Sequence, residues 1–202
     1  GSIEIAKQLA SAAAHAGADI VKTQSFFAEK GVSYIAPKAN YQITTTGNTE
    51  NQLDMVKKLE LSFNDQLELA SFCTKLGVIF MSTPFDKESL YFLVNNINLD
   101  MIKIGSGEIT NANFLFEVAS FQRNIILSTG MSTLGEIEEA LGIIAFGLLK
   151  TGEKPTRSLC KDAYISKKGQ LKLREKVSLL HCTTEYPAPY DEINLNCIAT
   201  LK

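Results

Sequence analysis

Two lysines stand near the ends of short apolar segments, and polar residues follow each of them at once. Lys22 lies in "DIVKTQ" and Lys103 lies in "DMIKIGS". Hydroxyl groups occupy similar places in other apolar segments, at Thr83, Ser106 and Ser128. Ammonium and hydroxyl groups together are suited to phosphate or carboxylate ligands. We therefore expect an anion-binding site built from strand ends.

The stretch "KIGSGEIT", from Lys103 to Thr110, is the densest of these clusters. Its two glycines let the backbone approach a ligand and direct N–H groups at an anion. Glu108 is the candidate general acid or base, or a group that holds a water or a metal. Its alternative role is to cap the helix expected to begin near Asn111. For the lysines, the alternatives are a Schiff-base nucleophile, as in an aldolase, and ion pairs with neighbouring carboxylates.

The two histidines do not form a metal site with each other. His181 stands beside Cys182 on an apolar segment, where a histidine is expected to be a core residue held by a hydrogen bond. His15 follows small residues near the end of a predicted helix, and we expect it at the surface or between helices. Neither histidine has a second histidine near enough in sequence to argue for a metal site.

Two kinds of segment alternate along the chain and would position these residues. Amphipathic segments with apolar residues three and four apart predict helices, and short apolar runs predict strands buried on both faces. The helices are expected at 3–17, 64–77, 87–97, 111–121 and 133–150, and the strands at 19–24, 78–82, 100–104, 125–128 and 177–182. This alternation predicts βαβ units and a parallel sheet.

Polar residues collect at the carboxyl end of each predicted strand. They are Lys22, Gln24, Ser82, Thr83, Lys103, Ser106, Ser128, Thr129, Thr183 and Thr184. Ligands bind at that edge in barrels and in open parallel sheets. A closed (β/α)8 TIM barrel needs eight strands and about 250 residues. We therefore predict an incomplete barrel of about five βα units, with the strands parallel and adjacent in chain order as an open arc. Residues 1–202 would form a single catalytic-domain segment.

Two stretches interrupt the alternation. Residues 25–52 are polar and turn-rich, as expected of a loop that covers a substrate. Residues 151–176 are charged and are expected to form a solvated helical insertion.

Composition excludes several classes of partner. The chain has 202 residues, 45% of them hydrophobic, and its 20 basic and 22 acidic residues give a net charge of -2. Without a basic run, neither nucleic acid nor an anionic membrane is an expected partner. The four cysteines show no Cys-x-x-Cys spacing, and no export signal or membrane span is seen, so we expect reduced thiols in a cytoplasmic protein.

Seven motifs in a fixed order extend this interpretation. They are "VKTQSF", "APKANYQ", "NQLDMVKKLELS", "FMSTPFD", "IKIGSGEITN", "ILSTGMSTLGEIEEA" and "LLHCTTEYPAPYDEINL". Together they resemble the sialic acid synthases, the family that makes N-acetylneuraminate and its bacterial relative legionaminate. The resemblance covers nearly the whole chain except the charged insertion at 151–176.

The resemblance implies a (β/α)8 barrel that condenses phosphoenolpyruvate with an N-acetylated sugar and releases phosphate. The acceptor would be N-acetylmannosamine or a 2,4-diacetamido-trideoxy mannose, giving N-acetylneuraminate or legionaminate. Both acceptors stay open, because synthases of both products share these motifs. The family also implies a divalent metal, Mn or Mg, and a homodimer.

The resemblance also implies roles for single residues. Lys22, Thr83, Lys103 and Ser106 match positions that bind phosphoenolpyruvate, and Gln24 lies beside them. Glu108 matches the acid/base position near the aldehyde. Asn48 and Tyr186 match positions that contact the sugar. Thr184 stands where some relatives carry an asparagine that binds phosphoenolpyruvate, and a hydroxyl could serve there.

The chain also departs from the family pattern. Relatives begin with an earlier strand and continue past Lys202 with histidines that bind the metal and with an antifreeze-like domain. We therefore expect the metal ligands outside this segment and no activity from the segment alone. Two other functions stay open. One is a 3-deoxy sugar acid phosphate synthase, which would need further cations, although Arg123, Arg157 and Arg174 are not at strand ends. The other is a non-catalytic anion-binding fragment.

Overall fold

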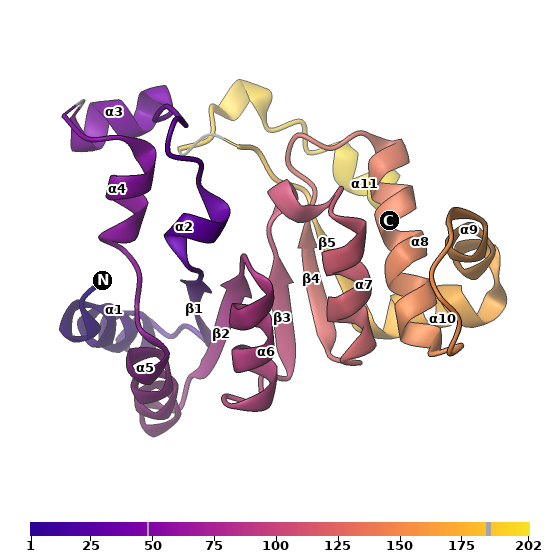
Figure 1. Cartoon of the computed structure of the whole chain (residues 1–202), viewed down its shortest axis with the longest axis horizontal. Helices are drawn as coiled ribbons and strands as arrows, with labels where there is room; N and C mark the ends of the chain where they lie inside the picture. Colours follow the sequence, from indigo (N-terminus) through magenta and orange to yellow (C-terminus); the bar gives the residue numbers. More distant parts are fainter. Residues whose placement is uncertain (48, 185–186) are drawn as a thin grey trace. The chain divides into compact units, whose positions relative to one another are not determined.

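A computed structural model of the chain describes residues 1–47, 49–184 and 187–202 (Figure 1). It consists of two compact units, Gly1–Leu99 and Asp100–Lys202, and each is described by itself. Both units combine parallel strands with helices, so the predicted α/β class is confirmed.

The first unit contains two strands and six helices among its described residues. In chain order they are α1 (Ile3–His15), β1 (Ile20–Ser25), α2 (Ala28–Gly31), α3 (Asn40–Thr46), α4 (Gln52–Lys57), α5 (Phe63–Leu76), β2 (Ile79–Pro84) and α6 (Lys87–Asn95). Strands β1 and β2 pair in parallel, with Lys22 beside Met81 and Gln24 beside Thr83. Side chains alternate between the two faces of a strand, so this register assigns every residue of the pair to a face.

One face of the β1–β2 pair is covered by helices. Phe80 and Val21 pack there with residues of α1, α5 and α6. The fully buried members of this core include Ala10, Leu69 and Leu93. Burial of these apolar side chains is the main contribution that fixes the helices on the strands.

The second unit contains three strands among the residues that the structure describes. Its described elements are β3 (Met101–Ile104), the 3-10 helix η1 (Ser106–Glu108), α7 (Ala112–Ser120), β4 (Asn124–Ser128), α8 (Leu134–Leu149), α9 (Arg157–Ile165), α10 (Lys167–Lys176), β5 (Val177–Leu180), η2 (Tyr190–Glu192) and α11 (Cys197–Leu201). The strand order is β3-β4-β5, and both pairings are parallel. Ile102, Ile104, Ile125 and Leu127 are almost completely buried in this sheet.

Local sequence signals explain where the longer helices begin and end. Ser62 and Asp65 form a capping box at the start of α5, and Thr133 and Glu136 form one at the start of α8. Helix α5 stops at Gly77, whose φ of 77° is left-handed and therefore favours glycine.

The strand prediction holds within each sheet. Every pairing among the described strands is parallel and follows chain order. The described strands nevertheless form two sheets, of two and three strands, rather than one arc of five.

Two irregular stretches differ from expectation. The predicted loop at 25–52 contains the short helices α2 and α3 and the start of α4. The charged stretch at 151–176 is helical, as predicted, but α9 and α10 are not simply solvated, because they pack against α8 (Figure 1). Cys160 and Leu173 are buried there, and a side chain at Gly142 of α8 would meet the Cys160 carbonyl oxygen at 3.0 Å.

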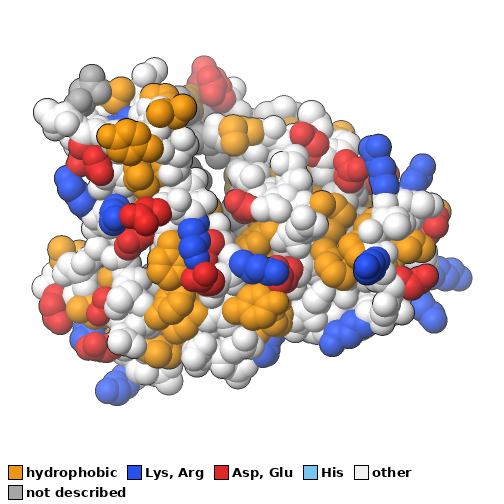
Figure 2. Space-filling view, in the orientation of Figure 1, with side chains coloured by type: hydrophobic (Ala, Val, Ile, Leu, Met, Phe, Trp, Pro, Cys, Tyr) orange, Lys and Arg blue, Asp and Glu red, His pale blue; other side chains and the backbone are white. Residues whose placement is uncertain are grey.

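Figure 2 shows basic and acidic side chains interspersed with apolar ones on the visible face, without a large patch of one sign. Within the part of the chain that the structure describes, no helix is long and apolar enough to cross a bilayer.

Candidate functional site

Lys103 is a buried lysine near the carboxyl end of β3 in the second unit. Only 8% of the residue is exposed. Its Nζ donates hydrogen bonds to the carbonyl oxygen of Ile104 and to the hydroxyl of Ser128, each at 2.7 Å. Both acceptors are neutral oxygens, and they accept two of the three donors of the ammonium. A lysine near the end of a strand can also take part in charge-assisted hydrogen bonds to an anion.

Further contacts connect the ends of β4 and β5. The Cys182 thiol lies 3.3 Å from the Ser128 hydroxyl, which it contacts as a hydrogen-bond donor. Thr129 donates both its backbone N–H and its hydroxyl to the carbonyl oxygen of Leu180, each at 3.0 Å. Cys182, which follows β5, is therefore connected with Lys103 through the Ser128 hydroxyl, and Thr129 is fixed to the end of β5.

Gly130 marks the place where three strand ends come together. A Cβ at this glycine would lie 3.2 Å from the Ser106 hydroxyl, 3.4 Å from the Thr183 carbonyl oxygen and 3.4 Å from Cγ2 of Thr184. Any side chain at position 130 would crowd these groups. The structure thus brings predicted site residues Ser106 and Thr184 close to each other, as the strand-end pattern suggested.

Glu108 ends the 3-10 helix η1 that begins at Ser106. Its Oε2 accepts a hydrogen bond of 2.8 Å from the side-chain amide of Asn111. Asn111, and not Glu108, caps α7, because its side-chain oxygen accepts from the backbone N–H of Phe114. The alternative of Glu108 as the direct cap is therefore wrong, although Glu108 holds the capping side chain in place. One carboxylate oxygen is used in this way.

In the first unit, three predicted site residues share one face of the β1–β2 pair. Lys22 and Gln24 are two residues apart on β1, and Thr83 lies beside Gln24 on β2. Lys22 and Gln24 are exposed, whereas Thr83 is 3% exposed. No hydrogen bond or ion pair involves the Lys22 ammonium among the described residues, so the alternative of a structural ion pair has no support at this lysine.

Ser82 was expected at the same edge but faces the other way. Its hydroxyl lies 2.7 Å from the hydroxyl of Ser25 and 3.2 Å from that of Thr23. Ser25 in turn donates to the side-chain oxygen of Gln66 on α5. Ser82 therefore belongs to a buried polar cluster between the strands and α5, and it does not share the face of Lys22. Alternation along β2 gives this result, since Ser82 and Thr83 are adjacent.

The remaining predictions divide into two groups. Asn48 and Tyr186 lie outside the described residues. The Nε2 of His181 lies 2.7 Å from the carbonyl oxygen of Ile193, which confirms the expected hydrogen bond, but the residue is half-buried and does not lie in the core. His15 is exposed, with Nδ1 at 2.8 Å from the carbonyl oxygen of Ser11.

Sequence reasoning missed two residues of the second unit's cluster, Gly130 and Cys182. Both are next to residues that were recognised, in "LSTG" and "HCTT". A glycine directly after a strand-end Ser-Thr pair was an available signal for close approach of another backbone. The thiol gave no such signal, because its contact with Ser128 depends on the pairing of β4 with β5.

The described residues hold no group of three or more His, Cys, Asp or Glu side chains arranged to bind a metal ion. That the metal ligands lie outside this segment stays a prediction. Two of the three arginines form ion pairs away from the strand ends. Arg157 pairs with Glu139 at 3.0 Å, and Arg123 lies 3.6 Å from Asp100, before the start of β4.

A family model described as the NeuB family matches residues 9–202. Over 202 residues the chain is 46% identical to an N,N'-diacetyllegionaminic acid synthase of Campylobacter jejuni, covering 100% of this chain and 53% of that protein. It is 37% identical to an N,N'-diacetyllegionaminic acid synthase of Legionella pneumophila, covering 100% of this chain and 50% of that protein. The chain thus spans about half the length of the curated relatives it matches.

Solved structures give a similar result. The chain resembles the crystal structure of an N-acetylneuraminic acid synthetase from Leptospira borgpetersenii in complex with citrate, with a TM-score of 0.72 and 26% identity. That match covers 98% of this chain and 55% of the other. A truncated 3-deoxy-D-arabino-heptulosonate 7-phosphate synthase from Thermotoga maritima matches with a TM-score of 0.51 and 14% identity, which is a likeness of fold.

Proposed function

Because this chain belongs to the NeuB family, we propose that the protein containing it condenses phosphoenolpyruvate with an N-acetylated amino sugar and releases inorganic phosphate. The relatives at 46% and 37% identity carry the name N,N'-diacetyllegionaminic acid synthase. They favour a 2,4-diacetamido-trideoxy mannose as the acceptor and legionaminate as the product, with N-acetylmannosamine and N-acetylneuraminate as the alternative pair. The proposed architecture is a (β/α)8 barrel to which the described strands contribute.

The observation that carries this proposal is the buried Lys103 ammonium held by Ser128 at the end of β3. The charged oxygens of phosphoenolpyruvate match an ammonium held in a largely water-excluded place, where electrostatic attraction is stronger than in water. Ser106 lies in the same cluster, close to Thr184 across Gly130. We propose that Lys103, Ser106 and Thr184 bind phosphoenolpyruvate. Lys22, Gln24 and Thr83 are proposed as phosphoenolpyruvate-binding residues of the first unit, on the resemblance and their shared face.

The proposed reaction balances without a redox partner. C3 of phosphoenolpyruvate bonds to the aldehyde carbon of the open-chain sugar, and the aldehyde oxygen takes a proton. Water adds at C2 and gives up a proton, and cleavage of the bond between C2 and the phosphate oxygen then releases phosphate. Glu108 is the proposed group that moves a proton in this sequence, since it follows the anion-binding turn. Its contact with Asn111 fixes the carboxylate in one orientation.

We also propose that turnover requires a divalent metal, Mn or Mg, whose ligands lie outside residues 1–202. When bound, such an ion would act as a Lewis acid on the aldehyde. Asn48 and Tyr186 are proposed to contact the sugar, on the resemblance alone. A cytoplasmic homodimer is proposed as the working form, and the four free thiols support a reducing compartment.

The experiment is a phosphate-release assay on the full-length protein with phosphoenolpyruvate and each acceptor in turn. We expect release with the diacetamido sugar in the presence of Mn or Mg, and its loss in excess chelator. Equal release in chelator would contradict the metal requirement. Phosphoenolpyruvate binding by calorimetry without any turnover would instead favour a non-catalytic anion-binding protein.

Glu108→Gln separates proton transfer from anion binding. We expect turnover to fall about 100-fold or more while phosphoenolpyruvate affinity stays within about 2-fold, because the amide keeps the shape but does not transfer protons in the same way. Normal turnover in this variant would contradict the role of Glu108. Borohydride treatment of the wild type tests the aldolase alternative, since a trapped adduct at Lys103 would show a Schiff base.

A further inference from the structure

Gly130 is a buried glycine that the proposed reaction does not use. It follows Thr129, just beyond the carboxyl end of β4. The Ser132 N–H donates to the Thr129 carbonyl oxygen at 3.2 Å, which closes a four-residue turn with Gly130 and Met131 at its centre. Glycine is common in such turns because of its conformational freedom, so the first question is whether the backbone here requires it.

The backbone of the turn does not explain the glycine. Met131 has a left-handed φ of 62°, whereas the φ of Gly130 does not lie in the left-handed region. A turn with a left-handed third residue favours glycine at that third position, and its second position is compatible with other residues. The sequence therefore carries a methionine where the backbone favours glycine, and a glycine one residue earlier. What remains as the reason for Gly130 is the absence of a side chain.

The surroundings of Gly130 show which group needs the space. A Cβ at position 130 would lie 3.2 Å from the Ser106 hydroxyl oxygen, which is a tight contact. The Thr183 carbonyl oxygen and Cγ2 of Thr184 would each lie at 3.4 Å, an ordinary van der Waals distance. These groups follow β3 and β5, which flank β4 in one sheet (Figure 1). A side chain at position 130 would therefore crowd the Ser106 hydroxyl most.

The Ser106 hydroxyl is available to a ligand. Ser106 is half-buried, and no hydrogen bond joins its hydroxyl to another residue that the structure describes. The buried Lys103 stands three residues earlier, near the end of β3. A hydroxyl donor that follows an ammonium at the end of one strand is suited to a phosphate or carboxylate ligand.

We propose that Gly130 is a positioning residue of the anion site: the absence of a side chain at this position leaves the Ser106 hydroxyl free to bind a phosphate or carboxylate oxygen. This inference rests on the proposed function, in which Ser106 binds phosphoenolpyruvate. It assigns no contact between Gly130 and the ligand. A methyl group at position 130 is accommodated when the Ser106 side chain rotates to another rotamer. The substitution should then weaken anion binding and leave folding intact.

The test compares Gly130→Ala with Gly135→Ala in the full-length protein. Gly135 is the matched control, since it lies in the first turn of α8 and a Cβ there would meet no atom within 4 Å. For Gly130→Ala we expect the affinities for phosphoenolpyruvate and for inorganic phosphate, measured by calorimetry, to fall about 10-fold or more, as for loss of a hydrogen bond to a charged group. The urea midpoint of unfolding should stay the same or rise, because alanine restricts the unfolded chain. Gly135→Ala should leave both affinities within about 2-fold.

A double-mutant cycle with Ser106→Ala identifies the group through which Gly130 acts. Once Ser106 is alanine, Gly130→Ala should change either affinity by no more than about 2-fold. An unchanged affinity in Gly130→Ala alone would overturn the inference, and so would an equal loss with and without the Ser106 hydroxyl. A large fall in the urea midpoint would also overturn it, because the crowding would then disrupt the fold instead of moving Ser106.

Binding and turnover separate failure of this inference from failure of the proposed function. Turnover in the wild type tests the proposed reaction, whereas the affinity for inorganic phosphate tests the anion site without any reaction. A wild type that binds phosphate but shows no turnover with phosphoenolpyruvate and an amino sugar contradicts the proposed reaction, and the cycle still decides the role of Gly130. A wild type that binds neither phosphoenolpyruvate nor inorganic phosphate overturns the inference together with the anion site.

Discussion

The two buried lysines, Lys103 and Lys38, are held in place in opposite ways. Lys103 lies on β3. Backbone pairing with β4 and the burial of Ile102 and Ile104 fix the backbone at Lys103 independently of its side-chain contacts. Lys38 lies in a segment with no other buried residue among the described part of 32–59, and its own side chain fixes that segment. The backbone position of Lys103 therefore does not depend on its own side chain, whereas the position of the segment around Lys38 does.

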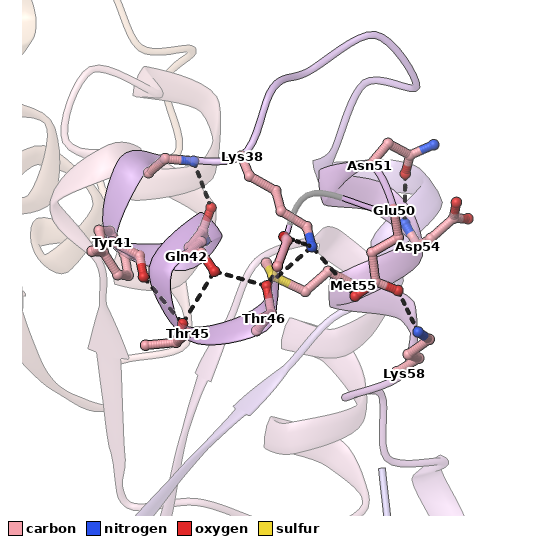
Figure 3. A network of polar contacts seen from close by, with 12 residues as sticks. Lys38, Tyr41, Gln42, Thr45, Thr46, Glu50, Asn51, Asp54, Met55 and Lys58 are labelled. Atoms are coloured by element: carbon pink, nitrogen blue, oxygen red, sulfur yellow. Dashed lines mark hydrogen bonds and ion pairs between the residues drawn. The ribbon is translucent and has the colours of Figure 1, made fainter.

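The two ammonium groups also draw their hydrogen-bond acceptors from different parts of the chain. Lys103 donates to the Ile104 carbonyl oxygen on β3 and to the Ser128 hydroxyl on β4. Lys38 donates to Thr46 and to the carboxylate of Glu50, which belong to its own segment (Figure 3). Substitutions should therefore affect stability, anion affinity and local order to different extents in the two regions.

The largest effect is expected from removing the apolar support of Lys103. Ile102→Ala should lower the free energy of unfolding by about 2–5 kcal/mol, because Ile102 is completely buried and the smaller side chain leaves a cavity. Urea denaturation followed by circular dichroism measures it. Ile165→Ala is the matched control, since Ile165 is 68% exposed and its loss should change stability little. Equal effects at both positions would mean that the sheet does not fix Lys103 as described.

Lys103→Ala should come next, and it should affect binding more than folding. Loss of a charge-assisted contact on the order of 1.5–3 kcal/mol corresponds to a roughly 10- to 150-fold weaker affinity for phosphoenolpyruvate. Calorimetry on the full-length protein measures this affinity. Lys75→Ala, which removes an exposed lysine of α5, is the control. Retained affinity in Lys103→Ala would remove the basis of the comparison between the two lysines.

A smaller effect is expected at Ser128. Ser128→Ala removes one acceptor of the Lys103 ammonium, and a single hydrogen bond contributes about 0.5–1.5 kcal/mol, or roughly 2- to 13-fold in phosphoenolpyruvate affinity. If Ser128 acts by orienting Lys103, this effect should disappear when Lys103 is already alanine. A double-mutant cycle measures that coupling. Ser120→Ala, at an exposed serine of α7, serves as the control, and additive effects in the cycle would show that Ser128 acts independently of Lys103.

The smallest effect is expected from lowering the pH, which protonates Glu50, the carboxylate that accepts hydrogen bonds from Lys38 and Lys58. The hydrogen bond from Lys58, with a further one from Lys38, lowers the pKa of Glu50 below its ordinary value of 4.5, and burial opposes this shift. A carboxyl whose pKa is lower in the folded state stabilises the fold above its unfolded pKa, and this contribution is lost as pH falls through the folded value. Hydrogen-exchange protection of α3, relative to α1, should therefore hold from pH 7 to about 5 and decline only below about 4.5. Glu50→Gln should lack this decline, and an identical decline in the variant would assign it to other groups.

Sequence patterns were sufficient for the elements that depend on local interactions. The apolar spacing of residues 3–15 and 134–149 predicted α1 and α8, and the short apolar runs predicted all five described strands and their parallel pairing. The positions of Lys22 and Lys103 on strands also followed from these runs. Such predictions succeed because hydrophobic periodicity and helix caps are properties of neighbouring residues.

Tertiary structure alone decided the contacts between distant residues. The contact of Ser128 with both Lys103 and Cys182 depends on the register of three strands. The contact of Ser25 with both Ser82 and Gln66 depends on which face α5 covers. Lys38 gave no signal in the sequence as a buried residue, since lysine is ordinarily exposed and its three acceptors come from Thr46, Gly47 and Glu50. Burial of a charge is decided by whether the folded chain supplies partners for every donor, and only the folded chain shows those partners.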